Sequence, residues 1–458
     1  MRVPPVDQTL GMRTYASETP GVGGTIRETI DDFLVQEVLA DGSVASIEEQ
    51  PESGALGTTA HMQDYLLCTL VKRNWDTLSA VMRIAKELEV SQSRIQIAGI
   101  KDARAVTAQH ITIEGASAEE VSRIRIPDIE VHPMGYFRDE MAPFYLLGNK
   151  FRVVINGIRK AEKDAANKIS ETIAELESLG GLPNFFGHQR FGTKRPITHL
   201  VGRSIVKGDF EEAAMLFLTH TSKYEHPESR QTRSELLSTR DFKRAFHDFP
   251  RQLRYERVML SHLTAEPKDF IGAFERLPPK LQELLVQAYQ SYLFNLFLSE
   301  RITGGFSLNK AELGDFVVSV DRSGLPIART GKIVSAESLA ETNNLIEARK
   351  LRIALPLIGM KQKPSEGVMG ENQRNILEKE GVEPKDFRVS ARRIMSGKGE
   401  LRAIISPIKE FSVQSIASKE DIRERVEAGL SFMLLRGSYA TMLLREIMKP
   451  RDPVASGF

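Results

Sequence analysis

The chain has 458 residues, which is too long for one ordinary hydrophobic core, so we expect two or three domains. Its 62 basic and 61 acidic residues give a net charge of +1, and 41% of all residues are hydrophobic, as in a soluble globular protein. A single cysteine, Cys68, excludes an internal disulfide framework and a zinc site made of cysteines. With no apolar run of about 18 residues and no apolar leader, the sequence predicts a cytoplasmic protein without a transmembrane helix or secretory signal.

Predicted strands and helices alternate through roughly the first 180 residues. Alternating apolar and polar residues predict strands at 31–39, 62–73 and 150–158, and a strand–loop–strand unit at 94–115. Amphipathic helices are predicted at 74–90 and 162–179. In the first helix we expect one buried stripe, formed by Leu78, Val81, Met82, Ala85 and Leu88. This order of elements indicates an α+β fold with a largely antiparallel sheet.

The character of the chain changes between about residues 195 and 385, where charge-rich helical patterns dominate. The long apolar segment 278–302 is predicted to be the core helix of a second domain, and residues 315–334 a small β-insert. After about residue 388 short strands return, and 430–448 is expected to be a strand that runs into a helix. Because the first type of pattern resumes at the end, we expect one domain to be inserted into another.

Standard cofactor motifs are missing. The segment "SGKGE" at 396–400 lacks the Ser or Thr and the upstream Gly of a phosphate-binding loop, and the nine histidines form no metal-binding array. A methyltransferase would need a Gly-rich loop after its first strand, and none is present. We therefore expect no metal and no cofactor. Lysine and arginine gather at 187–203, 384–409 and 434–451, which is typical either of an RNA- or phosphate-binding face or of ordinary solvated surface.

Three segments carry unusual chemistry for a scaffold. In "AGIKDARAVTAQ" (98–109), Lys101 adjoins Asp102; a lysine there can keep a carboxylate ionised for nucleophilic or base chemistry, although the segment alone favours a simple turn. In "PNFFGHQRFGTKRP" (183–196), aromatic and basic residues lie between glycines, as needed to stack an unpaired base and hold phosphates, or to plug a domain junction. In "LLRGSYATMLLRE" (434–446), Tyr439 follows a Gly-Ser turn and alone predicts nothing more.

Taken together and in order, these segments resemble the TruD family of pseudouridine synthases. The matching strings are "DDFLVQE", "GIKDARAVTAQ", "NFFGHQRFG", "ALPLIG" and "GSYATMLLRE", which span nearly the whole chain. The resemblance implies a V-shaped molecule. Its catalytic pseudouridine synthase domain, with a mainly antiparallel sheet, would comprise residues 1–190 and 390–458, and an inserted α+β TRUD domain residues 191–389. It also implies isomerisation of uridine to pseudouridine, at position 13 of tRNA, without cofactor or metal.

The resemblance also implies roles for individual residues. Asp102 would be the catalytic carboxylate, acting as a nucleophile at the anomeric carbon or as a base at its neighbour. Lys101, which would keep Asp102 ionised, and Glu37 would support it. The substrate-binding residues implied are Phe33, Asn184, Phe186, Arg190 and Tyr439. The chain departs from the common family pattern with aromatic exchanges at Phe185 and Tyr439, and with Ala103 in place of a basic residue.

The partner implied is tRNA, with other RNAs as further targets, and we expect a monomer that needs no membrane and no protein partner. The alternative is a non-catalytic RNA-binding or chaperone protein with the same fold. Such a protein would be expected to lack the aspartate at position 102, and Asp102 is present.

Overall fold

The computed structural model describes residues 2–47, 55–61, 64–389, 395–418 and 425–458. Its strands are β1 (Phe33–Leu39), β2 (Tyr65–Arg73), β3 (Ile95–Ile97), β4 (Val106–Glu114), β5 (Ile129–Phe137), β6 (Leu146–Ile158), β7 (Leu182–Pro183), β8 (Phe316–Val320), β9 (Pro326–Ile333), β10 (Leu351–Leu357), β11 (Glu400–Ala403), β12 (Ile405–Ser406), β13 (Ile408–Ser418) and β14 (Val426–Leu435). Its α-helices are α1 (Pro5–Thr9), α2 (Thr77–Glu87), α3 (Ala118–Ser122), α4 (Glu162–Ser178), α5 (Thr198–Val206), α6 (Phe210–Thr219), α7 (Pro227–Thr239), α8 (Phe242–Asp248), α9 (Arg254–Ala265), α10 (Phe270–Glu275), α11 (Pro279–Thr303), α12 (Leu339–Glu347), α13 (Gly367–Glu380) and α14 (Ala440–Met448).

The largest sheet has eight strands and draws them from both ends of the chain. Its order is β13-β14-β6-β1-β4-β2-β5, with β3 paired to β4. Strands β1 and β4 run parallel, and the other neighbouring strands of this sheet run antiparallel. The predicted α+β class and the mainly antiparallel sheet built from both chain ends are therefore confirmed. The strand predicted at 62–73 is observed from Tyr65 onward, and residues 62–63 lie outside the described residues.

The centre of this sheet is polar. Strand β4 is buried along its length except for its last residue, yet it carries the polar side chains of Thr107, Gln109, His110 and Thr112. Buried polar groups require hydrogen-bond partners. Gln109 finds one in the loop that precedes β4, and His110 Nδ1 lies 3.3 Å from Glu37 Oε2 of β1. Gln109 and His110 therefore hold neighbouring elements in place, whereas the buried Thr107 hydroxyl has no hydrogen-bond partner among the described residues.

Helix α2 differs from its prediction in the face that it buries. The buried residues are Thr77, Ala80, Val81, Ile84 and Ala85. Leu78 and Met82, which were predicted to be buried, are 48% and 50% exposed, so the prediction was wrong for both. The physical reason is the buried Thr77 hydroxyl, which bonds the loop before β4 and turns that face of the helix inward.

The middle of the chain forms helices and a four-stranded sheet of order β11-β10-β8-β9. The predicted core helix at 278–302 is confirmed as α11, and β8 and β9 form the predicted β-insert as an antiparallel pair. Strand β11 pairs with β10 in this smaller sheet, and the chain rejoins the large sheet at β13. The predicted boundary at residue 390, with part of the basic segment 384–409, lies outside the described residues.

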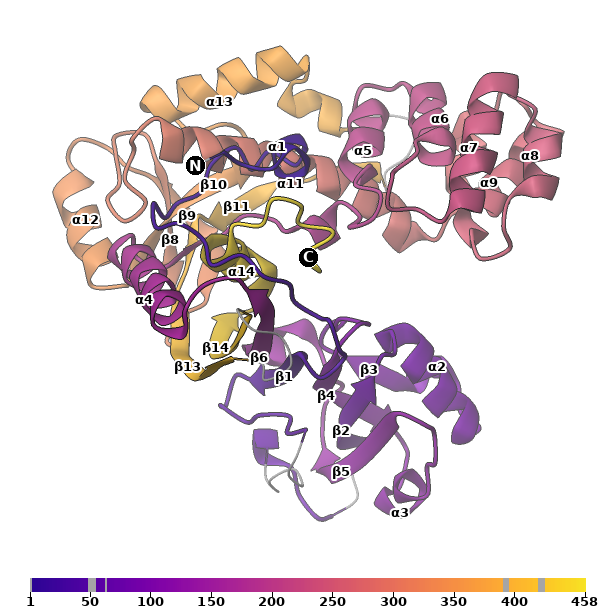
Figure 1. Cartoon of the computed structure of the whole chain (residues 1–458). Coiled ribbons are helices and arrows are strands. Elements are labelled where there is room, and N and C mark those ends of the chain that lie inside the picture. The colour runs from indigo at the N-terminus through magenta and orange to yellow at the C-terminus, as the bar shows by residue number, and fades with distance from the viewer. Residues whose placement is uncertain (1, 48–54, 62–63, 390–394, 419–424) are drawn as a thin grey trace.

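The outline of the molecule in Figure 1 is V-shaped. Helices α5 to α9 form one arm, β2 to β5 with α2 and α3 form the other, and the N-terminal segment crosses the shared middle near α14. Backbone hydrogen bonds tie the chain ends together, from Val22 N to Ile447 O and from Ile26 N to Ser456 O, both at 3.0 Å. This pairing carries residues near position 27 to the large sheet and the chain's end.

Candidate active site

Asp102 lies in the loop between β3 and β4, with its side chain 24% exposed. Two side chains from distant parts of the sequence donate to the same carboxylate oxygen, Oδ1. Arg27 Nη2 donates at 3.1 Å, and Gln189 Nε2 is the second donor. Among the residues that the structure describes, none donates to Oδ2. The carboxylate is thus oriented through one oxygen, Oδ1.

The loop around Asp102 is fixed through its backbone. Lys72 of β2 donates from Nζ to the carbonyl oxygens of Asp102, at 2.8 Å, and Trp75, at 2.7 Å. The Thr77 hydroxyl accepts from Lys101 N at 3.0 Å, and Gln109 Nε2 donates to Gly99 O at 3.1 Å. Burial lowers the pKa of Lys72 to about 8, against the opposing charges of Asp102 and Asp76. The turn therefore presents a fixed carboxylate.

Lys101 does not pair with Asp102. Its Nζ lies 2.8 Å from Glu37 Oε1 and donates to Asn149 Oδ1 at 2.6 Å. Glu37 is fully buried, and its second oxygen accepts from His110 N at 2.8 Å. Burial alone would raise the pKa of Glu37, but Lys101 and His110 outweigh burial and hold it below its usual value. The inference that Lys101 keeps Asp102 charged was wrong, because the lysine side chain points to β1.

Arg27 is the cation that contacts Asp102, and the sequence analysis missed it. Its guanidinium is buried, donates from Nη1 to Gly457 O at 2.9 Å, and lies 4.0 Å from the centroid of the Phe33 ring. Phe33 is 1% exposed, so the Arg27 guanidinium packs on a buried ring. Burial lowers the pKa of Arg27, and Asp102 opposes that shift. The only sequence signal for Arg27 was a basic residue shortly before the first strand.

The segment after β7 brings three further predicted residues together. Asn184 is fixed on both sides: its Nδ2 donates to Ala403 O at 3.0 Å, and its Oδ1 accepts from Arg402 Nη2 at 2.7 Å. Phe186 is 7% exposed, and the Arg402 guanidinium covers it at 4.1 Å from the ring centroid. Tyr439, at the start of α14, meets Phe186 with ring centroids 6.2 Å apart.

Arg190 and Arg402 place two cations at Phe186. Arg190 lies 5.7 Å from the ring centroid and donates to Ser291 Oγ and Gln287 Oε1 of α11. Burial lowers the pKa of both guanidinium groups, to about 10 for Arg402. Asn184, Phe186, Arg190 and Arg402 line one cavity of about 890 Å³. Arg402 was not among the predicted site residues; its signal was its place in the basic segment 384–409.

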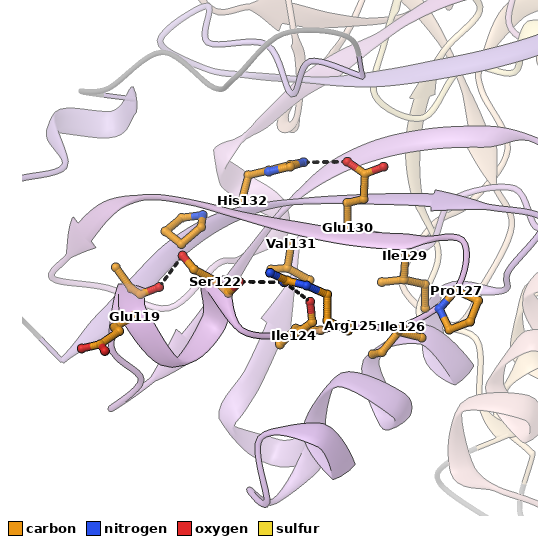
Figure 2. Close-up of a pocket in the computed structure, with 12 residues that line it drawn as sticks. Glu119, Ser122, Ile124, Arg125, Ile126, Pro127, Ile129, Glu130, Val131 and His132 are labelled. Carbon is orange, nitrogen blue, oxygen red and sulfur yellow. Dashed lines mark hydrogen bonds and ion pairs between the residues drawn. The ribbon is translucent and has the colours of Figure 1, made fainter.

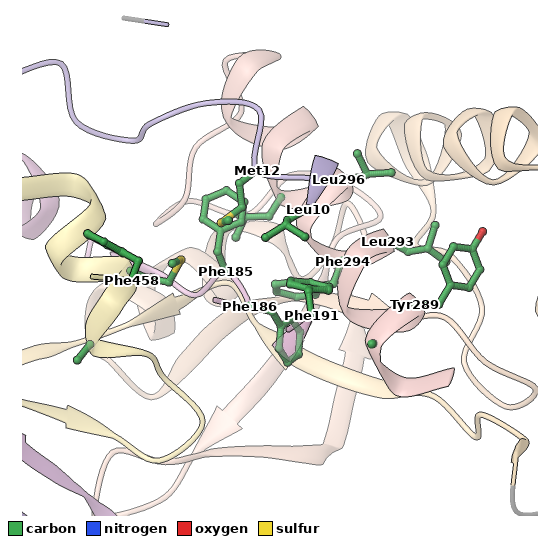
Figure 3. Close-up of a cluster of buried hydrophobic side chains, with 14 of the residues drawn as sticks. Leu10, Met12, Phe185, Phe186, Phe191, Tyr289, Leu293, Phe294, Leu296 and Phe458 are labelled. Atoms are coloured by element: carbon green, nitrogen blue, oxygen red, sulfur yellow. The ribbon is translucent and has the colours of Figure 1, made fainter. Parts of the chain in front are cut away.

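The other aromatic side chains of this segment pack into the core. Phe185 is 2% exposed and Phe191 is fully buried. Figure 3 shows both among the apolar side chains of the N-terminal segment and helix α11. The interpretation of "PNFFGHQRFGTKRP" as a plug at a domain junction therefore fits Phe185 and Phe191. Phe186 is the phenylalanine of this segment that lines the cavity.

The segment is also anchored by a buried ion pair. His188 Nε2 lies 2.7 Å from Asp7 Oδ1, and Asp7 Oδ2 accepts from Arg445 Nε of α14 at 2.6 Å. Burial raises the pKa of Asp7, but Arg445 and His188 outweigh it and hold the pKa low. Because His188 directly precedes Gln189, these bonds also hold the backbone next to the partner of Asp102.

The predicted residues thus form two groups. Asp102, Lys101, Glu37 and Phe33 belong to the large sheet and its loop. Asn184, Phe186 and Arg190 line the cavity, and Tyr439 contacts the Phe186 ring. The hydrogen bond from Gln189 to Asp102 joins them, because Gln189 and Arg190 are adjacent.

Another hollow, of about 990 Å³, lies between α3 and β5 and is lined by residues such as Arg125, Glu130 and His132 (Figure 2). None of the predicted site residues lines it. Within the part of the chain that the structure describes, no three His, Cys, Asp or Glu side chains gather so as to hold a metal ion. Among the helices of the same residues, none is long and apolar enough to cross a bilayer.

Known proteins resemble this chain along almost its whole length. A family model described as tRNA pseudouridine synthase D (TruD) matches residues 9–447. Proteins named probable tRNA pseudouridine synthase D from Methanosarcina mazei and Methanosarcina barkeri are 36% identical over 451 residues and 37% identical over 455 residues. These alignments cover 98% of both chains for the first protein and 99% of both chains for the second.

A solved structure agrees with the fold. The crystal structure of the putative tRNA pseudouridine synthase D from Methanosarcina mazei matches with a TM-score of 0.82 and 36% identity, covering 98% of this chain and 99% of that chain. The resemblance inferred from the sequence motifs is confirmed. This chain belongs to the tRNA pseudouridine synthase D (TruD) family.

Proposed function

We propose that this protein is a tRNA pseudouridine synthase that isomerises uridine to pseudouridine at position 13 of tRNA. One observation supports it most: Asp102 is held through Oδ1 by Arg27 and Gln189 in a backbone-fixed loop, while its side chain remains 24% exposed. A turn residue needs no such support, whereas a reacting carboxylate does.

The reaction requires a carboxylate and a shaped pocket. The bond between C1′ and N1 breaks, the uracil turns, and a bond forms between C1′ and C5. The C5 proton is lost and N1 ends protonated, so substrate and product are isomers and no oxidant or reductant is consumed. The chemistry is therefore within reach of side chains alone, in line with the expected absence of a cofactor.

Asp102 acts in this proposal as the nucleophile. Its Oδ2 attacks C1′, uracil leaves with the electron pair of the glycosidic bond, and C5 of the turned base later displaces the ester oxygen. Arg27 and Gln189 keep Oδ1 in place throughout. Abstraction of a proton at the neighbouring carbon is the alternative use of the same carboxylate.

The target base must leave its stack, which costs a few kcal/mol. In the proposal, Phe186, with Tyr439 packed against its ring, receives the base in the cavity, and Asn184 fixes the segment. Arg190 and Arg402 face the phosphates or the carbonyls of the base. Phe33 acts through Arg27, and Glu37 with Lys101 holds β1 to the loop. In the proposal the protein acts as a monomer in the cytoplasm, and both arms of the molecule contact the folded tRNA.

The proposed catalytic domain comprises residues 1–190 and 390–458, and the inserted domain residues 191–389. The pairing of β11 with β10 favours a working boundary just before β13, since β11 belongs to the smaller sheet.

Asp102→Asn tests the function. With tRNA that carries 5-tritiated uridine, we expect wild-type protein to release tritium and Asp102→Asn to release none while it still binds tRNA. Asp128→Asn is the matched control, because Asp128 is exposed and its left-handed φ of 62° suits asparagine equally well. Full activity of Asp102→Asn would overturn the assignment. Binding of tRNA without tritium release by the wild type would favour the non-catalytic RNA-binding protein.

A further inference from the structure

Ile100, two residues before Asp102, has the most exposed large hydrophobic side chain of the described residues, at 69%. Its neighbours in the loop are held firmly. Gly99 O accepts from Gln109, and Lys101 N donates to Thr77. The loop therefore projects Ile100 outward from a rigid frame, and mobility does not account for its exposure.

Three more exposed apolar side chains belong to elements that contact the same loop, and with Ile100 they form what we call the apolar rim. Leu78 directly follows Thr77, whose hydroxyl bonds Lys101, and Met82 lies one helical turn further along α2. Phe144, 65% exposed, precedes Leu146, whose Cδ2 is 4.0 Å from where a Cβ on Gly99 would lie. Single exposed apolar residues need no explanation, but a set on the elements that hold the Asp102 loop does.

The occupant that fits this rim is nucleic acid. Arg104 is exposed two residues beyond Asp102, and its charge is near enough to Arg27 to oppose that residue's protonation. An exposed apolar tip in the same loop as an exposed arginine, Arg104, matches stacked bases between phosphates. Apolar wedges such as Ile and Met enter base steps in proteins that distort nucleic acids.

We propose that Ile100 is the wedge that enters the RNA stack where the target uridine leaves it, with Leu78, Met82 and Phe144 covering the flanking nucleotides. The inference rests on the proposed function, since it places the extruded uridine at Asp102. Ile100 is a positioning residue in this scheme. It fills the vacated space, prevents the uridine from returning, and so raises the fraction of bound tRNA whose target reaches the cavity.

The test separates extrusion from binding and from chemistry. The tRNA carries 2-aminopurine next to the target uridine, because its fluorescence rises when it unstacks. In the Asp102→Asn protein, which binds without turnover, we expect tRNA to gain fluorescence. In Asp102→Asn with Ile100→Ala, the gain should vanish at saturating protein, while affinity changes by no more than about threefold. In otherwise wild-type protein, Ile100→Ala should lower kcat about tenfold and Ile100→Met should restore it.

The control is Leu237→Ala, which removes a similar apolar side chain, 59% exposed on α7, and should change neither readout. An unchanged fluorescence gain with Ile100→Ala would overturn the wedge, as would a loss of affinity with the gain intact at saturation. Failure of the proposed function is distinct, because then wild-type protein would form no pseudouridine on any tRNA.

Discussion

Lys101 forms its ion pair with Glu37, 2.8 Å away on strand β1, although Asp102 is its neighbour in the sequence. The pair is almost completely buried, and His110 binds the second oxygen of Glu37. Strand β1 begins at Phe33 and follows Arg27 in the chain, so this contact connects the Asp102 loop to the segment that supplies its cation. Its contribution is mainly to position the loop.

Replacing Glu37 by Gln should destabilise the protein by about 3 kcal/mol at pH 7, because a buried lysine loses its counter-charge. Lys101 and His110 lower the folded pKa of Glu37 below its usual 4.5, against burial. Its stabilisation is therefore complete above pH 4.5 and is lost as the pH falls through the lowered folded pKa. Urea unfolding of both proteins should show their difference shrinking in acid.

The matched control for this change is Glu410→Gln. Glu410 pairs with Lys150 at 2.8 Å, but its side chain is 58% exposed. An exposed pair contributes less than about 1 kcal/mol. A loss as large at Glu410 as at Glu37, or a Glu37 effect that does not vary with pH, would contradict the argument from burial.

The interaction of Arg27 with Asp102 predicts an effect on turnover. Arg27→Lys keeps a positive charge but cannot reach both Asp102 Oδ1 and Gly457 O with a fixed fork. We expect kcat to fall at least about tenfold with little change in KM for tRNA. Arg257→Lys is the control, since Arg257 donates to the carbonyls of Phe246 and Phe249 in the helical arm. Equal losses in both variants would indicate a general effect on folding.

The sequence predicted the sheet, the core helix and the place of Asp102, because hydrophobic periodicity and short motifs are local signals. It could not assign the partners of Asp102, because Arg27 and Gln189 reach it through contacts that span 75 and 87 residues. Adjacency misled at Lys101, since successive residues of a loop can point to opposite sides. The stripe predicted on α2 was wrong at Leu78 and Met82, because the helix buries the face that carries Thr77.

Gln189 offers a test by charge alone. Its Nε2 donates to Asp102 Oδ1, and Gln189→Glu changes the donor to a like-charged acceptor of the same shape. We expect activity to fall by about a hundredfold or more, and by a smaller factor in Gln189→Met, which removes the bond without adding charge. Single-turnover rates with saturating protein measure this directly. Equal rates in the two variants would show that the oxygen at this position tolerates a second carboxylate.

Arg402 predicts how firmly the base pocket is held. Its guanidinium lies 4.1 Å from the Phe186 centroid and bonds Asn184 and Gly437, and no carboxylate of the described residues lies within ion-pair distance of it. A desolvated cation–π contact contributes about 2 kcal/mol, so Arg402→Met should lower kcat/KM roughly 30-fold. Arg402→Lys should recover only part of this loss, because an ammonium cannot stack and bond Asn184 at the same time.

The control for Arg402 is Arg352→Lys. Arg352 belongs to β10 of the same small sheet, and burial lowers its pKa as it does for Arg402, but it lines a different cavity. If steady-state kinetics on tRNA show the same loss in both variants, Arg402 supports the sheet and not the pocket. If Arg402→Lys matches wild type while Arg402→Met does not, charge suffices and the stacked geometry is dispensable. A loss confined to Arg402, and only partly recovered by lysine, would assign the guanidinium to the wall on which the extruded base rests.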